Sequence, residues 1–205
     1  MKLLLHCCCA PCTVQCAVSF IEEGTRPDLY WYNPNIHPYT EYKARRDALV
    51  QYAAYTELEC RTDDEYGLRR FIGETGHAES GGAGGGKYPA RCAVCYRMRL
   101  ERTAARAAEW GYESFGTTLL ISPYQNHGLV RATAEEYAKK YSVPFLYRDF
   151  RPRFREGRSG ARNMGLYMQK YCGCIYSEEE RYLGGRPAPY SEAAPRPALS
   201  QAEKA

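Results

Sequence analysis

The sequence predicts an α/β fold with a doubly wound, mostly parallel sheet and a helical C-terminal segment. Short apolar runs, each of a length that suits a buried strand, alternate along the chain with longer segments whose apolar residues recur at helical spacing. Such alternation is typical of a parallel sheet that has helices on both faces. The length of 205 residues is sufficient for one domain with a core of this kind.

The first four elements alternate regularly. The apolar run near the N-terminus predicts a strand over residues 2–6, and apolar residues at helical spacing predict a helix over 13–23. A run rich in aromatic residues predicts a second strand over 28–32. Thr40 is a suitable N-cap for a second helix over 41–55.

The middle of the chain continues this pattern. A brief run predicts a third strand over 57–60, and a helix is expected over 65–75. The stretch 92–110 has the strongest helical pattern, and residues 114–120 form the fourth predicted strand. Between the two helices, the stretch 77–87, rich in Gly and Ser, predicts a flexible loop.

The last predicted elements are shorter. They are a helix over 134–141, a fifth strand over 144–147 and a helix over 161–170, which carries two methionines one helical turn apart. Residues 184–205 are rich in Pro, Ala, Ser and Glu and have no apolar periodicity. This composition predicts a disordered tail after a single domain over 1–183.

Polar or reactive residues follow three of the predicted strands. Cysteines follow the first strand, Asn33 follows the second, and residues 117–122, which include two threonines and a serine, follow the fourth. In doubly wound sheets, ligands bind beyond the carboxyl ends of the strands. The sequence therefore predicts one site at this edge of the sheet.

The chain carries a small excess of positive charge, most of it as arginine. Lys and Arg total 28 against 24 Asp and Glu, a net charge of +4. Arginines cluster within 91–106 and again within 148–162, where Phe150 and Phe154 lie among them. Arginines interleaved with aromatic residues suit a surface that binds nucleic acid, and the alternative is a solvated surface with scattered ion pairs.

Ten cysteines are the most unusual feature of the composition. No apolar run is long enough for a membrane span or for the apolar centre of a signal peptide, so we expect a cytoplasmic protein without a membrane partner. Cytoplasmic thiols are kept reduced, which favours metal or redox chemistry over a disulfide scaffold.

Two groups of cysteines are suited to hold a metal centre. Four cysteines fall within residues 7–12, and Cys92 and Cys95 form a CxxC pair much later in the chain. Cys8 and Cys9 together with the CxxC pair would supply the four thiolates that an iron–sulfur cluster requires. A structural zinc site also takes four sulfurs and stays an alternative.

Four further cysteines in these regions and nearby exceed what one cluster needs. Cys7, Cys16 and Cys60 fit the role of small core residues. Cys12 lies where the predicted loop turns into the first helix, and its position suits a ligand or redox group as well as a core residue.

Cys172 and Cys174 form a separate CxC pair near the end of the predicted domain. A disulfide between residues this close together closes a small, strained ring, and strained disulfides are readily reduced. The pair therefore favours thiol–disulfide exchange over a structural bridge.

Five motifs in this order resemble those of the QueH-type epoxyqueuosine reductases. The motifs are LLLHCCCAPC, YNPNIHP-x-x-EY-x-x-R, RC-x-x-CY-x-x-RL, TTLLISPYQNH and YCGCIYS, and they span residues 3–182. The resemblance implies reduction of epoxyqueuosine to queuosine at the wobble position of tRNA anticodons, without cobalamin. It also implies a sheet similar to the PP-loop, or nucleotide α-hydrolase, folds. The SGGxDS nucleotide loop of those folds is absent, so ATP use is not implied.

The resemblance assigns roles to the thiols. It implies that Cys8, Cys9, Cys92 and Cys95 hold a [4Fe-4S] cluster. It also implies an additional iron, or a zinc in its place, with Cys12 at the expected ligand position. The Cys172 and Cys174 pair is expected to form a disulfide. Because the reaction consumes two electrons, an external donor such as ferredoxin or flavodoxin is also expected.

Further residues are candidates for proton transfer and substrate binding. His37 and His127 are candidates for proton delivery to the leaving oxygen, along with Cys12 as a catalytic group, and each histidine is otherwise a hydrogen-bonded structural residue. Candidates for hydrogen bonds to the modified base, which otherwise cap strands and turns, are Asn33, Thr117, Thr118, Ser122, Tyr124 and Gln125. Candidates for phosphate contacts are Arg97, Arg99, Arg153, Arg155 and Arg158.

Two other functions are also considered. A zinc-stabilised nucleic-acid-binding module without catalysis would explain the arginines and the CxxC pair, but not the excess of thiols. A thiol oxidoreductase that acts on proteins would use Cys172 and Cys174 alone. The identity of the bound metal separates the first alternative from the reductase, and substitution of the CxC pair separates the second.

Overall fold

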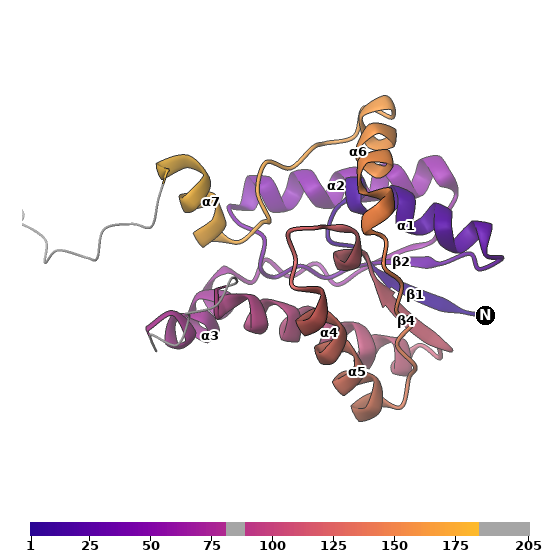
Figure 1. The fold of residues 1–205 in the computed structure, drawn as a ribbon, viewed down its shortest axis with the longest axis horizontal. Coiled ribbons are helices and arrows are strands. Elements are labelled where there is room, and N and C mark those ends of the chain that lie inside the picture. The colour runs from indigo at the N-terminus through magenta and orange to yellow at the C-terminus, as the bar shows by residue number, and fades with distance from the viewer. Residues whose placement is uncertain (81–88, 185–205) are drawn as a thin grey trace, which may run out of the picture.

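The computed structural model describes residues 1–80 and 89–184 and has one parallel sheet of four strands (Figure 1). The strands are β1 (Leu3–His6), β2 (Asp28–Trp31), β3 (Cys60–Thr62) and β4 (Ser114–Thr117). Their order in the sheet is β3-β2-β1-β4. Every pairing between neighbouring strands is parallel, as the alternation of strands and helices predicts.

Helices cover both faces of this sheet. In Figure 1, α1, α2 and α6 lie on one side of the strands, and α4 and α5 lie on the other. The helices are α1 (Ala10–Glu22), α2 (Tyr39–Thr56), α3 (Leu68–Ser80), α4 (Arg91–Glu109), α5 (His127–Tyr141), α6 (Phe154–Asn163) and α7 (Ile175–Leu183). Two short 3-10 helices are η1 (Thr118–Ile121) and η2 (Arg151–Arg153). The predicted doubly wound fold class is therefore confirmed.

The strands are buried because both faces of the sheet are covered. All four residues of β1 are buried, and Leu29, Tyr30 and Trp31 of β2 have no exposed surface. Central strands of parallel sheets read as continuous apolar runs for this reason. The same burial explains why the two central strands could be recognised from the sequence.

Several predicted boundaries shift. The third strand lies at Cys60–Thr62 rather than over 57–60. The fourth ends at Thr117, where its side chain accepts a hydrogen bond from the backbone of Leu119 and begins η1. The predicted fifth strand over 144–147 makes only an isolated bridge between Phe115 and Phe145.

The helix predicted over 161–170 is wrong in its position. In the structure α6 covers Phe154–Asn163, and the chain then turns at Gly165, which has a φ of +66° that favours glycine. The methionine spacing that suggested a longer helix does not report this turn. After it, a non-helical segment leads to α7.

Other helices are longer than predicted. α5 begins at His127, where the Asn126 side chain accepts from the backbone of Leu129, and α3 extends to Ser80. Most of the predicted glycine-rich loop and nearly all of the predicted tail over 184–205 lie outside the described residues. No helix in the described part of the chain is long and apolar enough to cross a membrane.

The strand order creates a switch point at β1. The chain moves outward from β1 through β2 to β3 and then returns to place β4 on the other side of β1. Ligand crevices in doubly wound sheets open at such a point, beyond the carboxyl ends of the strands. The loop that follows β1 carries the cysteine run, so the fold presents these thiols at the crevice.

Candidate functional site

The cysteines after β1 form a compact sulfur group. The Sγ atoms of Cys8, Cys9 and Cys12 all lie within 4.8 Å of one another, and those of Cys8 and Cys9 are 3.8 Å apart. α1 begins directly after Cys9, with a proline in its first turn, which brings Cys12 back beside the first two thiols. Cys7 is separate from the group, because its thiol donates to the backbone oxygen of Leu5 at 3.2 Å in the core.

Polar side chains from neighbouring strands hold this loop. Thr118 follows β4, and its Oγ1 accepts from the backbone N–H of Cys8 at 3.1 Å and donates to the Cys8 sulfur at 3.4 Å. Asn33 follows β2, and its side-chain amide donates to the backbone oxygen of Cys7 at 2.9 Å. The carboxyl ends of three strands therefore meet at the cysteines. In this arrangement Thr118 and Asn33 support the loop and do not line the cavity that it borders.

A cavity of about 290 Å³ lies beside the sulfur group and is lined by cysteines from three separate parts of the chain. These cysteines are Cys8, Cys12, Cys92, Cys95, Cys172 and Cys174. Cys92 and Cys95 come from the first turns of α4, and the last two come from the segment before α7. The three thiol groups that the sequence singles out thus face one space.

Two parts of the cavity differ in exposure, and we name them by their residues. The cavity floor consists of Cys8, Cys12, Arg45, Cys92, Cys95 and Arg99, which are buried or half-buried. The cavity rim consists of Tyr124, Phe154, Arg158 and Lys170, which are exposed or half-buried.

A buried ion pair fixes the C-terminal segment against the floor. Arg45 and Glu41 on α2 form an ion pair of 2.6 Å, with the Arg45 side chain only 2% exposed. Arg45 also donates to the backbone oxygens of Tyr171 at 2.9 Å and Cys172 at 3.1 Å. Tyr167 donates to the other oxygen of Glu41. One charged pair therefore holds both ends of a short segment.

The backbone around Gly173 completes this attachment. The Gly173 carbonyl accepts from the His37 N–H at 2.7 Å, and the Tyr171 hydroxyl donates to the His37 carbonyl. Gly173 has a φ of +123°, and a Cβ there would lie 3.0 Å from a side-chain carbon of Ile36. Only glycine fits both the conformation and the space, which explains the glycine between the two cysteines.

Gln169 is a site residue that the sequence analysis missed. Its Nε2 lies 2.9 Å from the Cys9 sulfur and 3.9 Å from the Cys12 sulfur, as a donor to both. It reaches them because the non-helical segment after Gly165 runs across the cysteine loop. A single glutamine in an unpredicted loop gave no signal in the sequence.

Hydrogen bonds among the clustered thiols separate their pKa values. The Cys12 and Cys9 thiols donate to Cys8 and hold its pKa well below the usual range. The pKa of Cys12 is raised mainly because it is the donor to Cys8, and the pKa of Cys9 is raised mainly by burial. Burial also raises the pKa of Cys92 to about 12 and that of Cys95. Without a metal, the group therefore carries its first negative charge on Cys8.

The donor set indicates which ligands fit. The group near β1 offers three sulfurs and no carboxylate, and the CxxC pair adds two more sulfurs to the same cavity. Soft thiolate donors select iron–sulfur clusters or zinc over magnesium or calcium. The residues present thus fit the predicted class of metal centre.

The CxC pair is a dithiol in this structure. All ten cysteines lie within the described residues and are free thiols, so the expected disulfide is not formed. The sulfurs of Cys172 and Cys174 are 3.8 Å apart, and Cys172 Sγ lies 2.9 Å from Ser177 Oγ. The hydrogen bond with Cys174 and then that with Ser177 lower the pKa of Cys172 to about 5, while the pKa of Cys174 is raised by its bond to Cys172 and by burial.

Neither predicted catalytic histidine lines the cavity. His37 is fully buried between the rings of Tyr66 and Phe71, and burial lowers its pKa to about 4, so it is neutral at pH 7. Its two ring nitrogens have no hydrogen-bond partner within the described part of the chain. His127 begins α5, with Nε2 at 3.1 Å from the Ser122 carbonyl.

The predicted base-binding residues divide into two sets. Ser122, Tyr124 and Gln125 line the cavity, and the Gln125 Oε1 accepts from the Tyr96 hydroxyl at 2.6 Å. Thr117, like Asn33 and Thr118, is committed to local structure, because it caps η1 and its Oγ1 lies 2.9 Å from Nδ1 of buried His6.

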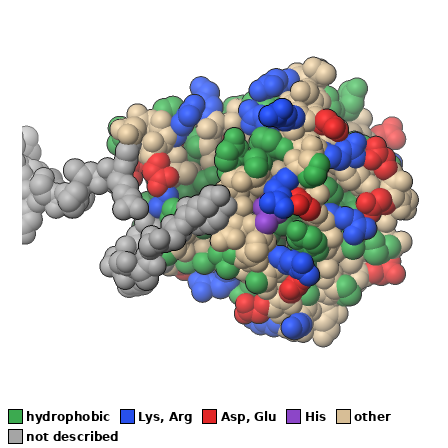
Figure 2. All heavy atoms as spheres, in the orientation of Figure 1, with side chains coloured by type: hydrophobic (Ala, Val, Ile, Leu, Met, Phe, Trp, Pro, Cys, Tyr) green, Lys and Arg blue, Asp and Glu red, His purple; other side chains and the backbone are tan. Residues whose placement is uncertain are grey.

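The predicted phosphate-binding arginines also divide. Arg97 is ion-paired with Glu74, and Arg153 with Glu22 and Glu156. Arg155 and Arg158 have no ion pair with any residue that the structure describes, although Arg158 lies over the Phe154 ring at 5.8 Å. Basic side chains gather over α6 in the upper part of the view in Figure 2.

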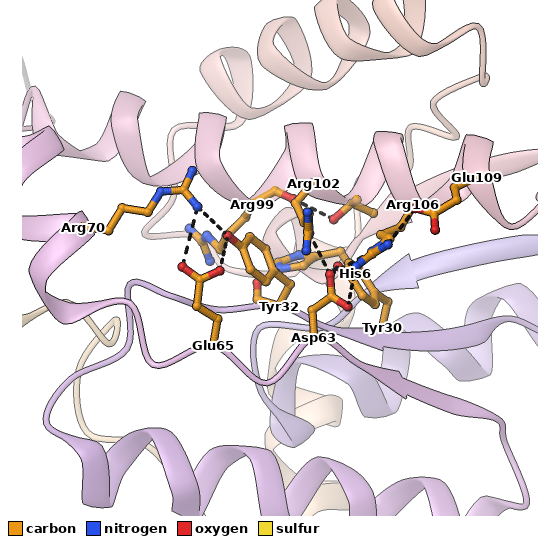
Figure 3. Close-up of polar contacts among 11 residues, drawn as sticks. His6, Tyr30, Tyr32, Asp63, Glu65, Arg70, Arg99, Arg102, Arg106 and Glu109 are labelled. Carbon is orange, nitrogen blue, oxygen red and sulfur yellow. Dashed lines mark hydrogen bonds and ion pairs between the residues drawn. The ribbon is translucent and has the colours of Figure 1, made fainter.

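Arg99 is placed apart from the other arginines of α4. Figure 3 shows Arg102 and Arg106 of this helix bound to Asp63, which also accepts from the Tyr30 hydroxyl. Arg99 instead is 4% exposed, and it donates to the Cys95 sulfur at 3.0 Å. The sequence predicted a phosphate contact for Arg99, but its contact in the structure is to sulfur.

Comparisons with known proteins agree with the geometry. The family model described as epoxyqueuosine reductase QueH matches residues 3–180. A protein of Dehalococcoides mccartyi named epoxyqueuosine reductase QueH is 40% identical over 91% of this chain and 96% of its own length. Proteins with the same name from Thermotoga maritima and Acinetobacter baylyi are 34% and 32% identical, over 87% and 86% of this chain and over 91% and 80% of their own lengths. The chain therefore belongs to the epoxyqueuosine reductase QueH family, as its five motifs predict, and is an oxidoreductase.

Proposed function

We propose that this chain reduces epoxyqueuosine to queuosine at the wobble position of tRNA anticodons. The observation that carries the proposal is the cavity lined by six cysteines from three segments of the chain. The names of the relatives support the substrate. In this reaction both carbon–oxygen bonds of the epoxide are broken, two electrons and two protons are consumed, and the oxygen leaves as water while an alkene forms.

Cys8, Cys9, Cys92 and Cys95 would hold a [4Fe-4S] cluster. The support is that Cys8 and Cys9 belong to one compact sulfur group and that Cys92 and Cys95 line the same cavity as Cys8. When bound, such a cluster supplies electrons singly at low potential. Cys12 lies within 4.8 Å of Cys8 and Cys9, which suits the ligand of a second metal, either iron or zinc. With no second metal bound, its raised pKa would keep Cys12 protonated, so that it could serve as a proton donor.

The cavity rim would receive the anticodon loop. Tyr124 is 77% exposed and meets the Phe154 ring at 6.1 Å, Arg158 lies over the Phe154 ring, and Lys170 adds positive charge to the same cavity. Bases of an anticodon loop are already unpaired, so one can stack on Tyr124 while another enters the cavity. Ser122 and Gln125 would then hydrogen-bond the base that enters.

The remaining predicted residues keep narrower roles. Arg155 and Arg158 would contact phosphates, whereas Arg97 and Arg153 would have to leave their ion pairs to do so. Asn33, Thr117 and Thr118 would act by fixing the loops at the crevice. His37 and His127 stay predictions as proton donors that would require a movement toward the cavity.

Cys172 and Cys174 would form a redox-active pair at the cavity wall. The lowered pKa of Cys172 makes it a thiolate at neutral pH, which suits thiol–disulfide exchange. Because Cys172 is already a thiolate, closure of the disulfide would release two electrons and one proton, the proton coming from the Cys174 thiol, and an external donor would reduce the disulfide again. We propose a ferredoxin or flavodoxin as the external electron donor and a cytoplasmic location, in keeping with ten free thiols.

The decisive experiment measures the metal centre and the reaction together. After purification without oxygen, we expect about four irons and four acid-labile sulfides per chain, or about five irons with a second iron bound. The loaded protein, given a low-potential reductant, should convert epoxyqueuosine in tRNA to queuosine. Zinc without sulfide in folded protein would instead favour a nucleic-acid-binding module.

A second experiment tests the thiol oxidoreductase alternative. Replacing both Cys172 and Cys174 by Ser should leave the iron and sulfide content unchanged. If queuosine formation still requires Cys8 and Cys95 in this background, the cluster is the reactive centre. Activity toward protein disulfides that depends only on the CxC pair would support the alternative.

A further inference from the structure

Arg99 is a buried cation whose hydrogen-bond partner is a predicted cluster ligand. It lies one helical turn after Cys95 on α4 and is 4% exposed. Its Nη2 donates to the Cys95 sulfur at 3.0 Å, and its Nε donates to the Cys95 backbone oxygen at 3.1 Å. Two bonds from one guanidinium fix both its distance and its orientation relative to the sulfur.

The charge of Arg99 has no carboxylate to balance it. Within residues 1–76 and 89–184, no Asp or Glu forms an ion pair with Arg99, whereas the equally buried Arg45 is paired with Glu41 at 2.6 Å. The Cys95 and Cys8 sulfurs hold the pKa of Arg99 above its usual range against the opposing effect of burial. A buried guanidinium is costly unless a negative charge faces it. The site therefore balances this cation with sulfur.

We infer that Arg99 is a positioning residue that raises the reduction potential of the sulfur-bound centre. This inference rests on the proposed function, since it concerns the cluster that Cys95 would help to hold. An added electron increases the negative charge on the ligand sulfurs. A fixed positive charge and an N–H···S hydrogen bond at 3.0 Å stabilise that charge, and hydrogen bonds to cluster sulfurs are known to set cluster potentials.

Its placement at both halves of the ligand set strengthens this inference. Arg99 bonds directly to Cys95 of the CxxC pair and acts electrostatically on Cys8 of the run after β1. A residue that served only to stabilise α4 would not need to lie close to ligand sulfurs from both the CxxC pair and the cysteine run after β1. Burial keeps water from screening its charge, so its influence on the potential should exceed that of any exposed arginine nearby.

The test compares two arginines of the same helix. Arg99→Met removes the buried charge, and Arg102→Met removes a charge that is 43% exposed and paired with Asp63. Midpoint potentials are measured on cluster-loaded protein by redox titration followed by EPR, after iron and sulfide have been counted. For Arg99→Met we expect a more negative midpoint potential. At a fixed potential the ratio of reduced to oxidised cluster should fall about tenfold, which corresponds to a midpoint shift of about 59 mV for a one-electron couple. Arg99→Lys should shift the midpoint potential less than Arg99→Met does, and Arg102→Met should leave it unchanged.

The possible failures are distinguishable. A loaded Arg99→Met protein with the midpoint of Arg102→Met would overturn the inference and leave the proposed function standing. Wild-type protein without iron and sulfide would overturn both. Failure of Arg99→Met and Arg99→Lys alike to take up iron and sulfide would assign Arg99 to cluster assembly, and would also overturn its role in setting the potential.

Discussion

The cavity floor and the cavity rim are built in different ways. On the floor, each charged side chain already has its partner: Arg45 is bound to Glu41, and Arg99 to Cys95. On the rim, Tyr124 is 77% exposed, and Arg158 and Lys170 have no ion pair with any described residue. The floor is thus preorganised before a substrate arrives, whereas the rim is left to make its polar contacts with a partner.

This difference suggests separate tasks, with the floor suited to the reaction and the rim suited to binding the substrate. Preorganised groups in a water-poor site serve electron and proton transfer, because they do not have to reorient during the reaction. Exposed aromatic and basic groups suit a polyanion whose contacts form only on binding. Substitutions on the floor should therefore remove or alter the metal centre or destabilise the fold, and those on the rim should weaken RNA binding alone.

The largest effect is expected from Cys95→Ser on the floor. Loss of one of four thiolates should abolish the visible absorbance of the cluster and the formation of queuosine, because serine is a poor ligand for iron in such clusters. Absorbance and iron content after oxygen-free purification check this. Cys60→Ser, in the half-buried Cys60 of β3, is the matched control and should retain both. Retained absorbance in Cys95→Ser would remove Cys95 from the ligand set.

The next effect concerns the ion pair that supports the floor. Glu41→Gln leaves the buried charge of Arg45 without a counter-charge, and such a loss typically costs about 3 kcal/mol of unfolding free energy. Chemical denaturation measures this change. Asp47→Asn breaks the surface pairs with Lys43 and Arg46 on the same helix and should cost below about 1 kcal/mol. An equal decrease in unfolding free energy in the two variants would show that the buried ion pair stabilises the fold no more than a surface ion pair does.

The sequence predicts the floor only in outline. The carboxyl ends of parallel strands must meet at one edge, so the convergence of Cys8, Asn33 and Thr118 follows from the order of strands and helices. The thiols are also recognisable, because their density and CxxC spacing are unusual. These features depend on local pattern and topology, which the sequence contains.

The remaining contacts depend on the path of one irregular segment. Gln169 reaches Cys9, and Arg45 reaches Tyr171 and Cys172, only because the chain turns at Gly165 and runs across the cavity. Helical spacing places Arg99 on α4 but does not say that a sulfur faces it. Side-chain partners that come from distant loops therefore need the structure.

Near the rim, the two arginines that have no ion pair with a described residue should matter more than two that are paired. The double variant Arg155→Gln, Arg158→Gln should weaken tRNA binding roughly 10- to 100-fold. The slope of log K against the logarithm of the salt concentration should become shallower by about 1 for each arginine removed. The matched control is Arg148→Gln with Arg153→Gln, whose arginines are held by Glu23 and by Glu22 and Glu156. Binding is measured over a series of salt concentrations. A larger loss of tRNA affinity in the Arg148→Gln, Arg153→Gln variant would indicate that the RNA-binding surface lies closer to α1 and η2.

The smallest of these effects is expected at Tyr124. Tyr124→Ala should cost about 1 kcal/mol in tRNA binding, the low end for loss of one stacked base, because Phe154 remains beside it at the rim. Tyr124→Phe keeps the ring and should bind as wild type, which separates stacking from a hydrogen bond of the hydroxyl. Both variants should keep the iron and sulfide content of the wild type, since the ring lies outside the floor. If Tyr124→Phe instead binds as weakly as Tyr124→Ala, the hydroxyl is the contact and the rim recognises a polar group rather than a base face.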